Sequence, residues 1–245
     1  MPRDASDTRR KLLDAAALAF AEHGVHNASL LDITRQAGQR NRGALHYHFG
    51  SRDGVLCAVL EEHVEFLARR EGELLEVARA TPADEVEPVV EAVARPAAEL
   101  GESGWRGRCF LLVLAELIEE DPGSLSPGVT SALARTGGDA VYAVLAERMP
   151  DLQREVLLER LALMTMFILR AVADRARVEQ GAQAPAPLRA GGRARPQLPY
   201  EPFVQNLVAM AAAAVTAPDR VGPVPASGST RGGRGRSAGG RAPRR

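Results

Sequence analysis

Cysteine is scarce in this 245-residue sequence, and the two that occur, Cys57 and Cys109, lie far apart and outside any C-x-x-C pair. Their spacing indicates neither a disulfide framework nor a cysteine-based zinc site, and it fits a reducing cytoplasm. Long hydrophobic runs are also lacking: "LALMTMFIL" at 161–169 is about half of the ~18 residues that a membrane-spanning helix needs. We therefore expect a soluble, cytoplasmic protein that does not enter a membrane.

Alternating runs of β-branched residues, which are typical of strands, do not occur in the sequence. Apolar residues instead recur three and four positions apart through most of residues 7–180, which is the periodicity of amphipathic helices. The fold class predicted is all-α. Helices are expected at about 7–22, from Ser29 to near Gly38, and at 42–47, 52–79, 84–101, 105–120, 128–148, 151–180 and 200–216.

Charge is distributed unevenly, although the formal net charge of the chain is zero. Residues 1–52 carry a net charge of +3, residues 53–180 carry −11, and residues 181–245 carry +8. Only the two ends therefore favour contact with a polyanion such as nucleic acid. The Arg-rich end leaves two interpretations open: an arm that attracts phosphates, or an extension without a role in a chain whose only lysine is Lys11.

The stretch "QRNRGALHYHFGSRDG" at 39–54 contains three arginines and an asparagine together with histidine, tyrosine and phenylalanine, three residue types that are rare in the chain. A metal site is disfavoured because His46 and His48, two apart, point to opposite sides of a helix, and no further ligand cluster lies nearby. A catalytic loop is disfavoured because neither a nucleophile with a base nor a phosphate-binding glycine loop followed by lysine occurs. We expect no enzyme activity, no metal and no cofactor.

Nucleic-acid contact fits both the residue types and their setting. Two short helices joined at a glycine form a helix-turn-helix, whose second helix enters the major groove of DNA. Arginine and asparagine make two-pronged contacts with guanine and adenine, whereas arginine, tyrosine, serine and helix N-termini suit phosphates. An ordinary solvated helical hairpin would not favour these side chains over lysine and glutamate.

Three segments in order, "FAEHG" (20–24), "SLLDITRQAG" (29–38) and "GALHYHFGSRDGVL" (43–56), resemble the DNA-binding domain of the tetracycline-repressor (TetR) family. Two features depart from the commoner family pattern: six residues separate Gly38 from Leu45, and His46 stands where tyrosine is frequent. The resemblance implies an N-terminal three-helix DNA-binding domain at 1–52. A larger helical ligand-binding and dimerisation domain would follow at 53–216, with a linker at 181–199, and a disordered Arg-rich tail at 217–245.

Site residues are assigned on this basis. Gln39, Arg40 and Arg42 are expected at bases, with Asn41 shared between capping the recognition helix and contacting DNA. Gly43 permits close backbone approach, and Phe49 faces the core with Ala44 and Leu45. The complete DNA-binding set comprises Ser29, Gln39, Arg40, Asn41, Arg42, Gly43, His46, Tyr47, His48, Ser51 and Arg52.

The resemblance further implies a homodimer on a palindromic DNA operator and a small-molecule effector, with an apolar or aromatic compound favoured. Expected effector contacts are His63, Phe66, Trp105, Cys109, Phe110, Met164 and Phe167. Expected dimer contacts are Leu157, Leu161, Met164, Ile168, Val172, Phe203, Leu207 and Met210.

The sequence thus predicts a sequence-specific transcriptional regulator, most simply a ligand-responsive repressor. Two alternatives stay open at this point. One is a small-molecule binder or enzyme without specific DNA affinity, and the other is a protein that coats DNA without sequence preference.

Overall fold

The computed structural model describes residues 2–41, 43–121, 123–149, 151–183 and 197–220. These residues form helices and no strand, so the all-α prediction is confirmed for the described part of the chain. Ten helices follow one another: α1 (Pro2–His23), α2 (Leu30–Gln36), α3 (Ala44–Phe49), α4 (Arg52–Arg79), α5 (Glu87–Glu102), α6 (Trp105–Leu117), α7 (Pro127–Ala134), α8 (Asp139–Arg148), α9 (Arg154–Gln183) and α10 (Tyr200–Val215).

Short-range signals set the ends of the first helices. Ser29 and Ser51 precede α2 and α4, and their hydroxyl oxygens accept the backbone N–H of Asp32 (3.3 Å) and Gly54 (3.0 Å). Each serine therefore satisfies one of the N–H groups that a helix N-terminus leaves without a partner. Gly24 stops α1 with a φ of 85°, a left-handed conformation that glycine adopts without strain.

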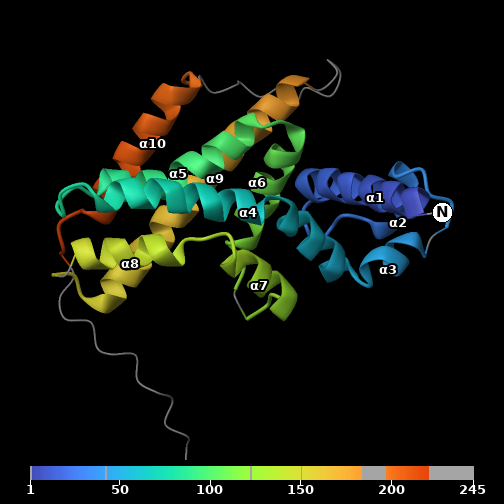
Figure 1. The fold of residues 1–245 in the computed structure, drawn as a ribbon, viewed down its shortest axis with the longest axis horizontal. Coiled ribbons are helices and arrows are strands. Elements are labelled where there is room, and N and C mark those ends of the chain that lie inside the picture. Colours follow the sequence, from blue (N-terminus) through green and yellow to red (C-terminus); the bar gives the residue numbers. More distant parts are fainter. Residues whose placement is uncertain (1, 42, 122, 150, 184–196, 221–245) are drawn as a thin grey trace, which may run out of the picture.

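The three N-terminal helices form a small unit at one end of the molecule (Figure 1). Their shared core contains Leu12, Phe20, Ile33 and Leu45, each at most 4% exposed. Helix α1 also packs on α6, and the Arg106 guanidinium donates two hydrogen bonds, of 2.7 and 2.8 Å, to the Asp14 carboxylate. The N-terminal unit is therefore tied to the rest of the chain through α6 as well as through α4.

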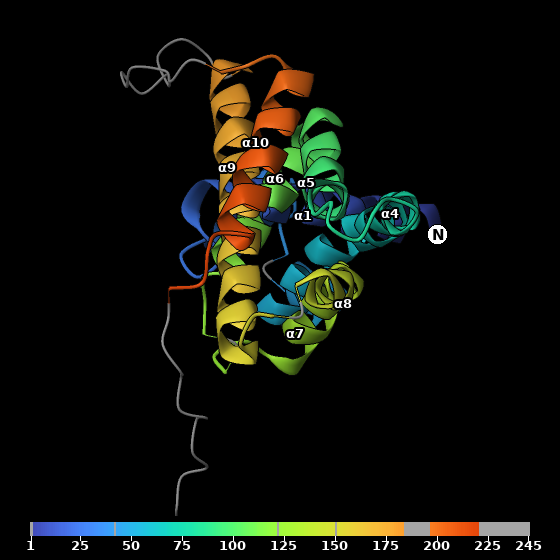
Figure 2. The same cartoon turned by 90° about the vertical axis from the view of Figure 1, so that its left-hand side faces the viewer.

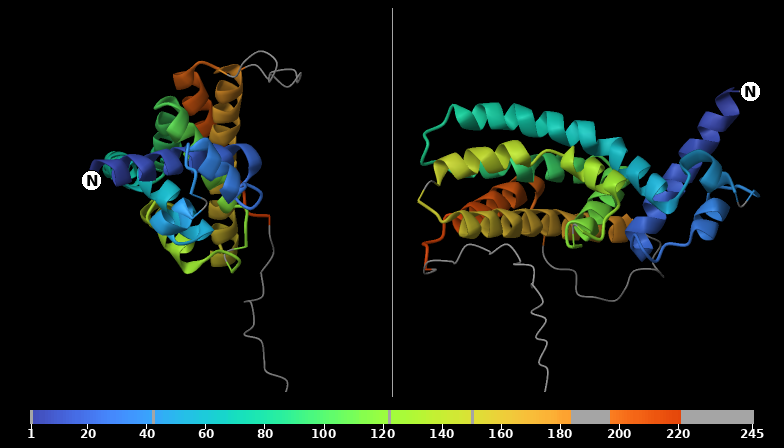
Figure 3. Two further views of the ribbon diagram at one scale, coloured as in Figure 1. Left: turned by 90° about the vertical axis from the view of Figure 1, so that its right-hand side faces the viewer. Right: turned by 90° about the horizontal axis from the view of Figure 1, so that it is seen from below.

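The larger part is a helical bundle in which α4 packs on α5, and α9 packs on α5, α6 and α10. Helix α6 is buried along almost its whole length, from Gly107 to Ala115, so it runs through the core of the bundle. Helices α9 and α10 lie side by side on one surface (Figure 2). The view from below shows α4 running from the N-terminal unit along the whole bundle (Figure 3).

Several expected helix boundaries are wrong by two to five residues, and one expected helix is divided in two. The single helix expected at 128–148 is two helices, α7 and α8, because Gly137 and Gly138 adopt φ values of 105° and 86° that interrupt the helix. The third helix begins at Ala44 and not at residue 42. No helix in the described ranges has the length and apolarity needed to cross a bilayer.

Most of the expected linker and tail, residues 184–196 and 221–245, lies outside the described residues. The described parts of these two segments are the end of α9, residues 197–199 that lead into α10, and residues 217–220 that follow it.

Candidate nucleic-acid interface and effector cavity

Helix α3 has one face in the core and one face in solvent. Ala44 and Leu45 are buried, and Phe49 is half-buried beneath the Arg9 guanidinium, which lies 4.9 Å from the ring centroid. The inward orientation predicted for these three residues is confirmed. On the opposite face His46 is exposed, and 83% of the Tyr47 surface is accessible. An aromatic side chain so exposed on a recognition helix is available to a partner.

The connection between α2 and α3 is held by a local hydrogen bond. The Asn41 side-chain oxygen accepts the Gly43 backbone N–H at 2.9 Å, and Gly43, as the N-cap residue, accepts the Tyr47 N–H at 2.9 Å. Asn41 therefore stabilises the turn before the helix and is not itself the N-cap, which corrects the expected capping. Arg40 is exposed in the same connection, whereas Arg42 lies outside the described residues.

Four further predicted DNA contacts are already engaged in interactions within the protein: Gln39, His48, Ser29 and Ser51. Gln39 is half-buried and its amide donates to the Ala37 carbonyl at 3.4 Å. His48 is half-buried and packs edge-on against Tyr47, with ring centroids 5.1 Å apart. Both serine hydroxyls cap helices, so a phosphate contact by either would share the same oxygen. As DNA contacts, all of these residues stay predictions.

Arg52 has a structural role that the sequence did not indicate. Its half-buried guanidinium donates hydrogen bonds to the backbone carbonyls of Val25 (2.8 Å) and Ala28 (2.7 Å), in the segment that leads from α1 to α2. The expected phosphate contact would have to compete with these two bonds. The arrangement indicates a clamp that fixes the start of α2 against the start of α4.

Replacing Arg52 with alanine is expected to destabilise the protein by roughly 1–3 kcal/mol, because two carbonyls lose a charged donor. Urea unfolding followed by circular dichroism measures this loss. Arg52→Lys should fall between the parent and Arg52→Ala, since an ammonium group lacks the planar fork that reaches both carbonyls. Parental stability combined with weaker DNA binding in Arg52→Ala would instead support the phosphate role.

A cavity of about 250 Å³ lies within the bundle, between α4, α5, α6, α9 and the turn from α7 to α8. Its walls are mostly apolar, with hydroxyl groups and two carboxylates near the turn. The lining residues are Leu67, Glu71, Val93, Pro96, Ala97, Leu114, Ile118, Leu133, Ala134, Thr136, Gly137, Gly138, Asp139, Tyr142, Thr165 and Leu169.

Glu71 is the buried charged residue of this cavity, with 8% of its surface exposed. Its carboxylate accepts the Gly138 backbone N–H, at 2.8 and 3.0 Å from the two oxygens. Burial raises the pKa of Glu71, the Gly138 hydrogen bond partly offsets this rise and the charge of Asp139 adds to it, so that the pKa is about 7. Nearby, the Tyr142 hydroxyl lies 2.6 Å from the Thr165 hydroxyl.

None of the seven expected effector contacts lines this cavity. Cys109, Phe110 and Met164 are buried in the core, and the His63 ring packs edge-on against Phe110 with centroids 5.2 Å apart. Burial lowers the pKa of His63. Phe66 lies 5.9 Å from the Arg69 guanidinium, Trp105 lies 4.6 Å from that of Arg106, and Phe167 is partly exposed on α9. The structure does not bring the seven together, and as effector contacts they stay a prediction.

Sequence reasoning missed the cavity because its walls are small or aliphatic residues with no chemical signature. One signal was present: Glu71 lies four residues from Leu67 and from Leu75, on the buried face of α4. A carboxylate on an otherwise apolar stripe indicates either a structural contact or a ligand site.

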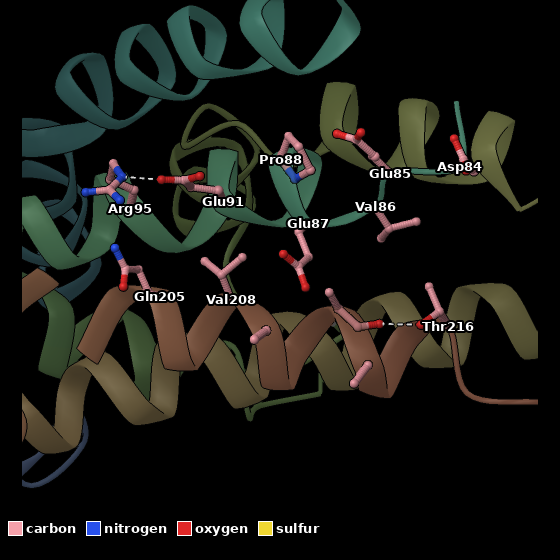
Figure 4. Close-up of a pocket in the computed structure, with 13 residues that line it drawn as sticks. Asp84, Glu85, Val86, Glu87, Pro88, Glu91, Arg95, Gln205, Val208 and Thr216 are labelled. Carbon is pink, nitrogen blue, oxygen red and sulfur yellow. Dashed lines mark hydrogen bonds and ion pairs between the residues drawn. The ribbon is translucent and has the colours of Figure 1, made fainter. Parts of the chain in front are cut away.

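A second hollow, of about 640 Å³, is an open groove between α10 and the segment that enters α5 (Figure 4). Its rim carries the exposed carboxylates of Asp84, Glu85 and Glu87. At one end the Arg95 guanidinium donates to both Glu201 oxygens, at 2.7 and 2.9 Å. The charges here are solvated or paired, so the groove lacks the enclosed carboxylate that distinguishes the inner cavity.

Most of the expected dimer contacts are buried within a single chain, and as dimer contacts they stay a prediction. Five of them on α9 and one on α10 are at most 8% exposed within a single chain, because they pack on neighbouring helices: Leu157, Leu161, Met164, Ile168, Val172 and Leu207. Phe203 is half-buried, with the Arg175 guanidinium 5.0 Å from its ring centroid, and Met210 is 50% exposed.

A different apolar stripe is exposed on α9. It comprises Leu158, Leu163, Met166 and Phe167. Met210 is exposed on α10, which packs on α9, so both helices present large apolar side chains to solvent. We call these five residues the exposed α9–α10 patch.

Among described residues, the short helices α2 and α3 and the turn between them form a helix-turn-helix, the arrangement that many DNA-binding proteins use. The family model for bacterial regulatory proteins of the tetR family matches residues 12–59, which span most of α1, all of α2 and α3, and the start of α4. The N-terminal helices of this chain are therefore similar to the tetR family, and the predicted resemblance is confirmed over this region.

Known proteins match over segments of similar length. Residues of this chain are 44% identical over 57 positions to the HTH-type transcriptional regulator SrpR of Pseudomonas putida, covering 23% of this chain and 26% of SrpR. They are 37% identical over 65 positions to the A-factor receptor protein of Streptomyces griseus, covering 25% and 23%. The chain thus matches about a quarter of the length of these relatives.

Similarity beyond this region is one of fold. The crystal structure of AibR in complex with isovaleryl coenzyme A and operator DNA aligns with a TM-score of 0.51 at 16% identity, covering 83% of this chain and 97% of AibR. The chain, including its larger helical part, therefore shares its fold with AibR.

Proposed function

We propose that this protein is a ligand-responsive transcriptional repressor that binds a palindromic DNA operator as a homodimer. The observation that carries the proposal is the outward face of α3, where Tyr47 is 83% exposed beside His46 and Arg40 on a tetR-family helix-turn-helix. The protein acts by binding, in the cytoplasm, and not by catalysis. Residues 1–52 read DNA, and residues 53–216 bind the effector and form the dimer.

Two helices connect the cavity to the DNA-reading unit. Leu114 and Ile118 of α6 line the cavity, and between them Glu116 accepts the backbone N–H of Val25 at 2.9 Å. Four residues after Glu116, the Glu120 carboxylate lies 2.6 Å from the His26 ring nitrogen. An effector that shifts the end of α6 therefore moves the segment in front of α2, provided that it prefers one arrangement of the helices.

Helix α4 provides the second connection. It lines the cavity with Leu67 and Glu71, and its N-terminus holds the helix-turn-helix through the Arg52 clamp. Since α4 is one continuous helix of 28 residues, a displacement at Glu71 is transmitted towards Arg52. This arrangement supports an effector that changes the spacing of the two DNA-reading units of a dimer.

Nuclease protection of the DNA adjoining the gene tests the proposal. The expected result is a protected short palindrome, with protection lost on adding the effector. Uniform protection of every duplex would support a DNA-coating protein, and no protection at low salt would support a small-molecule binder or enzyme without specific DNA affinity. Either result would contradict the proposed function.

In the same assay, Tyr47→Ala and Arg40→Ala are each expected to weaken operator binding roughly tenfold or more, since each removes a contact to DNA. Arg79→Ala is the charge-matched control, because Arg79 is exposed at the opposite end of α4. A comparable loss in Arg79→Ala would show that net charge alone, and not the α3 surface, determines affinity.

A further inference from the structure

We infer that the inner cavity binds a small lipophilic cation, with an ammonium group against Glu71 and an apolar or aromatic body against α5, α6 and α9. The inference rests on the proposed function in taking this cavity as the effector site, and it adds the charge and the size of the ligand.

The expected size of the ligand follows from the volume of the cavity. Its volume of about 250 Å³ lies below the ~300–1,000 Å³ of pockets that hold drug-sized ligands. A compound with on the order of ten non-hydrogen atoms is the appropriate match. The exposed Ala134 and Asp139 mark where the cavity reaches solvent, next to the turn between α7 and α8.

The expected charge of the ligand follows from the residues that line the cavity. Helices α5, α6 and α9 contribute only uncharged side chains, and the two ionisable residues besides Tyr142 are the carboxylic acids Glu71 and Asp139. No arginine, lysine or histidine belongs to the described lining. The cavity therefore has a negative potential at one end and apolar walls elsewhere, which favours a cation with a hydrophobic body.

Glu71 is poised for such a partner. A buried carboxylate without a counter-ion is costly, and the Gly138 N–H at the start of α8 compensates only part of that cost. A carboxylate has about four acceptor positions, so it can accept further donors from a ligand. In the described residues no ion pair to Glu71 is formed by any Arg, Lys or His side chain, so a ligand ammonium would supply the missing charge.

Glu71 also has a simpler role as the cap of α8. The preference of the cavity for a charged over a neutral ligand distinguishes this role from that of a cation site. A cap needs only an acceptor for the Gly138 N–H, which glutamine supplies equally well. A cation site needs the negative charge. The substitution Glu71→Gln therefore removes the preference for a cation and keeps the cap.

Calorimetric titration of the full-length protein at pH 8 with three matched probes tests the inference. The probes are 2-phenylethylammonium, neutral 2-phenylethanol and anionic phenylacetate. The ammonium compound is expected to bind roughly tenfold or more tightly than the alcohol, and phenylacetate more weakly still. Glu71→Gln should bind the ammonium and the alcohol alike, whereas Glu65→Gln, on the exposed face of α4, should behave as the parent.

The pH dependence in the unmodified protein gives a second test that does not depend on the variant folding. The ionisable groups facing Glu71 are Asp139 and Tyr142, both from α8. Because the pKa of Glu71 is about 7, its carboxylate is charged at pH 8 and neutral well below pH 6. The preference for 2-phenylethylammonium, which stays protonated across this range, should disappear as the pH falls.

Several results would overturn the inference. Equal or tighter binding of the alcohol or of phenylacetate at pH 8 would do so, as would an ammonium preference that survives in Glu71→Gln or at pH 5.5. Failure of all three probes to bind at millimolar concentration would also reject it. Operator binding is measured separately, so a protein that binds DNA but not the cation rejects this inference alone, and loss of DNA binding rejects the proposed function alone.

Discussion

Replacing Gly54 with alanine is expected to lower the free energy of unfolding by about 3 kcal/mol and to abolish operator binding at ordinary protein concentrations. A Cβ atom at this position would lie 1.9 Å from the Phe49 carbonyl oxygen and 3.0 Å from its carbonyl carbon. Both are backbone atoms at the end of α3, so the clash cannot be relieved by rotating a side chain. Either α4 moves away from α3 or the end of α3 is distorted.

Gly54→Ala should reduce the free energy of operator binding by more than it reduces the free energy of unfolding, because α3 carries the exposed recognition surface. The direct measurements are urea unfolding and operator titration at concentrations where the variant is folded. Gly72→Ala is the matched control in the same helix, since no atom lies within 4 Å of its added Cβ. It should stabilise the protein by about 0.5–1 kcal/mol through helix propensity.

Opposite signs for two glycine-to-alanine changes in one helix would be hard to explain by propensity alone. If Gly54→Ala instead retained parental stability and operator affinity, the close packing of α3 on α4 would be refuted. If Gly54→Ala retained its stability but lost DNA binding, α3 alone would have moved to relieve the clash. That result would identify α3 as the least rigid helix of the N-terminal domain.

Features governed by neighbouring residues were predictable from the sequence. Helix α2 begins after Ser29 because the Ser29 hydroxyl accepts the backbone N–H of Asp32, three residues later. Helix α1 ends at Gly24 because glycine adopts the left-handed conformation there. The range expected for α4, 52–79, agrees with the observed helix. The break between α7 and α8 was also encoded locally, in Gly137 and Gly138, but the helical periodicity on either side outweighed it.

Features governed by distant packing were not predictable. Helix α9 is apolar on two faces: one includes Leu161 and Ile168, and the other includes Leu163 and Phe167. The periodicity of the sequence does not indicate which of the two faces packs on the core of the same chain. The face predicted from the sequence to form the dimer is the one that is buried within a single chain. The cavity likewise depends on how five helices meet, and the Arg52 clamp depends on carbonyl groups that no side-chain pattern reveals.

The double change of Leu163 and Met210 to glutamate is expected to convert the protein into a folded monomer. Both residues belong to the exposed α9–α10 patch, with 56% and 50% of their surfaces accessible in one chain. In a homodimer formed through this patch, the new carboxylates would lose water without gaining a partner, and they would repel their two-fold copies. Sedimentation analysis measures the change in mass, and circular dichroism measures the retained helix content.

Operator binding by this monomer should fall by on the order of 10²–10⁴, because each DNA-reading unit then binds its half-site without the effective concentration that the second unit provides. Val77→Glu is the matched control: Val77 is an apolar residue of α4 that is 66% exposed, so its substitution should leave both mass and affinity unchanged. A double variant that remained dimeric would place the interface elsewhere, for example along the groove between α5 and α10.

A third variant separates the exposed face of α9 from its buried face. Ile168 has no exposed surface, so Ile168→Glu places a charge in the core and is expected to lose helix content along with dimerisation. The Leu163 and Met210 changes should lose the dimer alone. If Ile168→Glu stayed folded and merely became monomeric, the stripe of Leu157, Leu161 and Ile168 would be the true interface, and the assignment of this stripe to the core of one chain would have to be reversed.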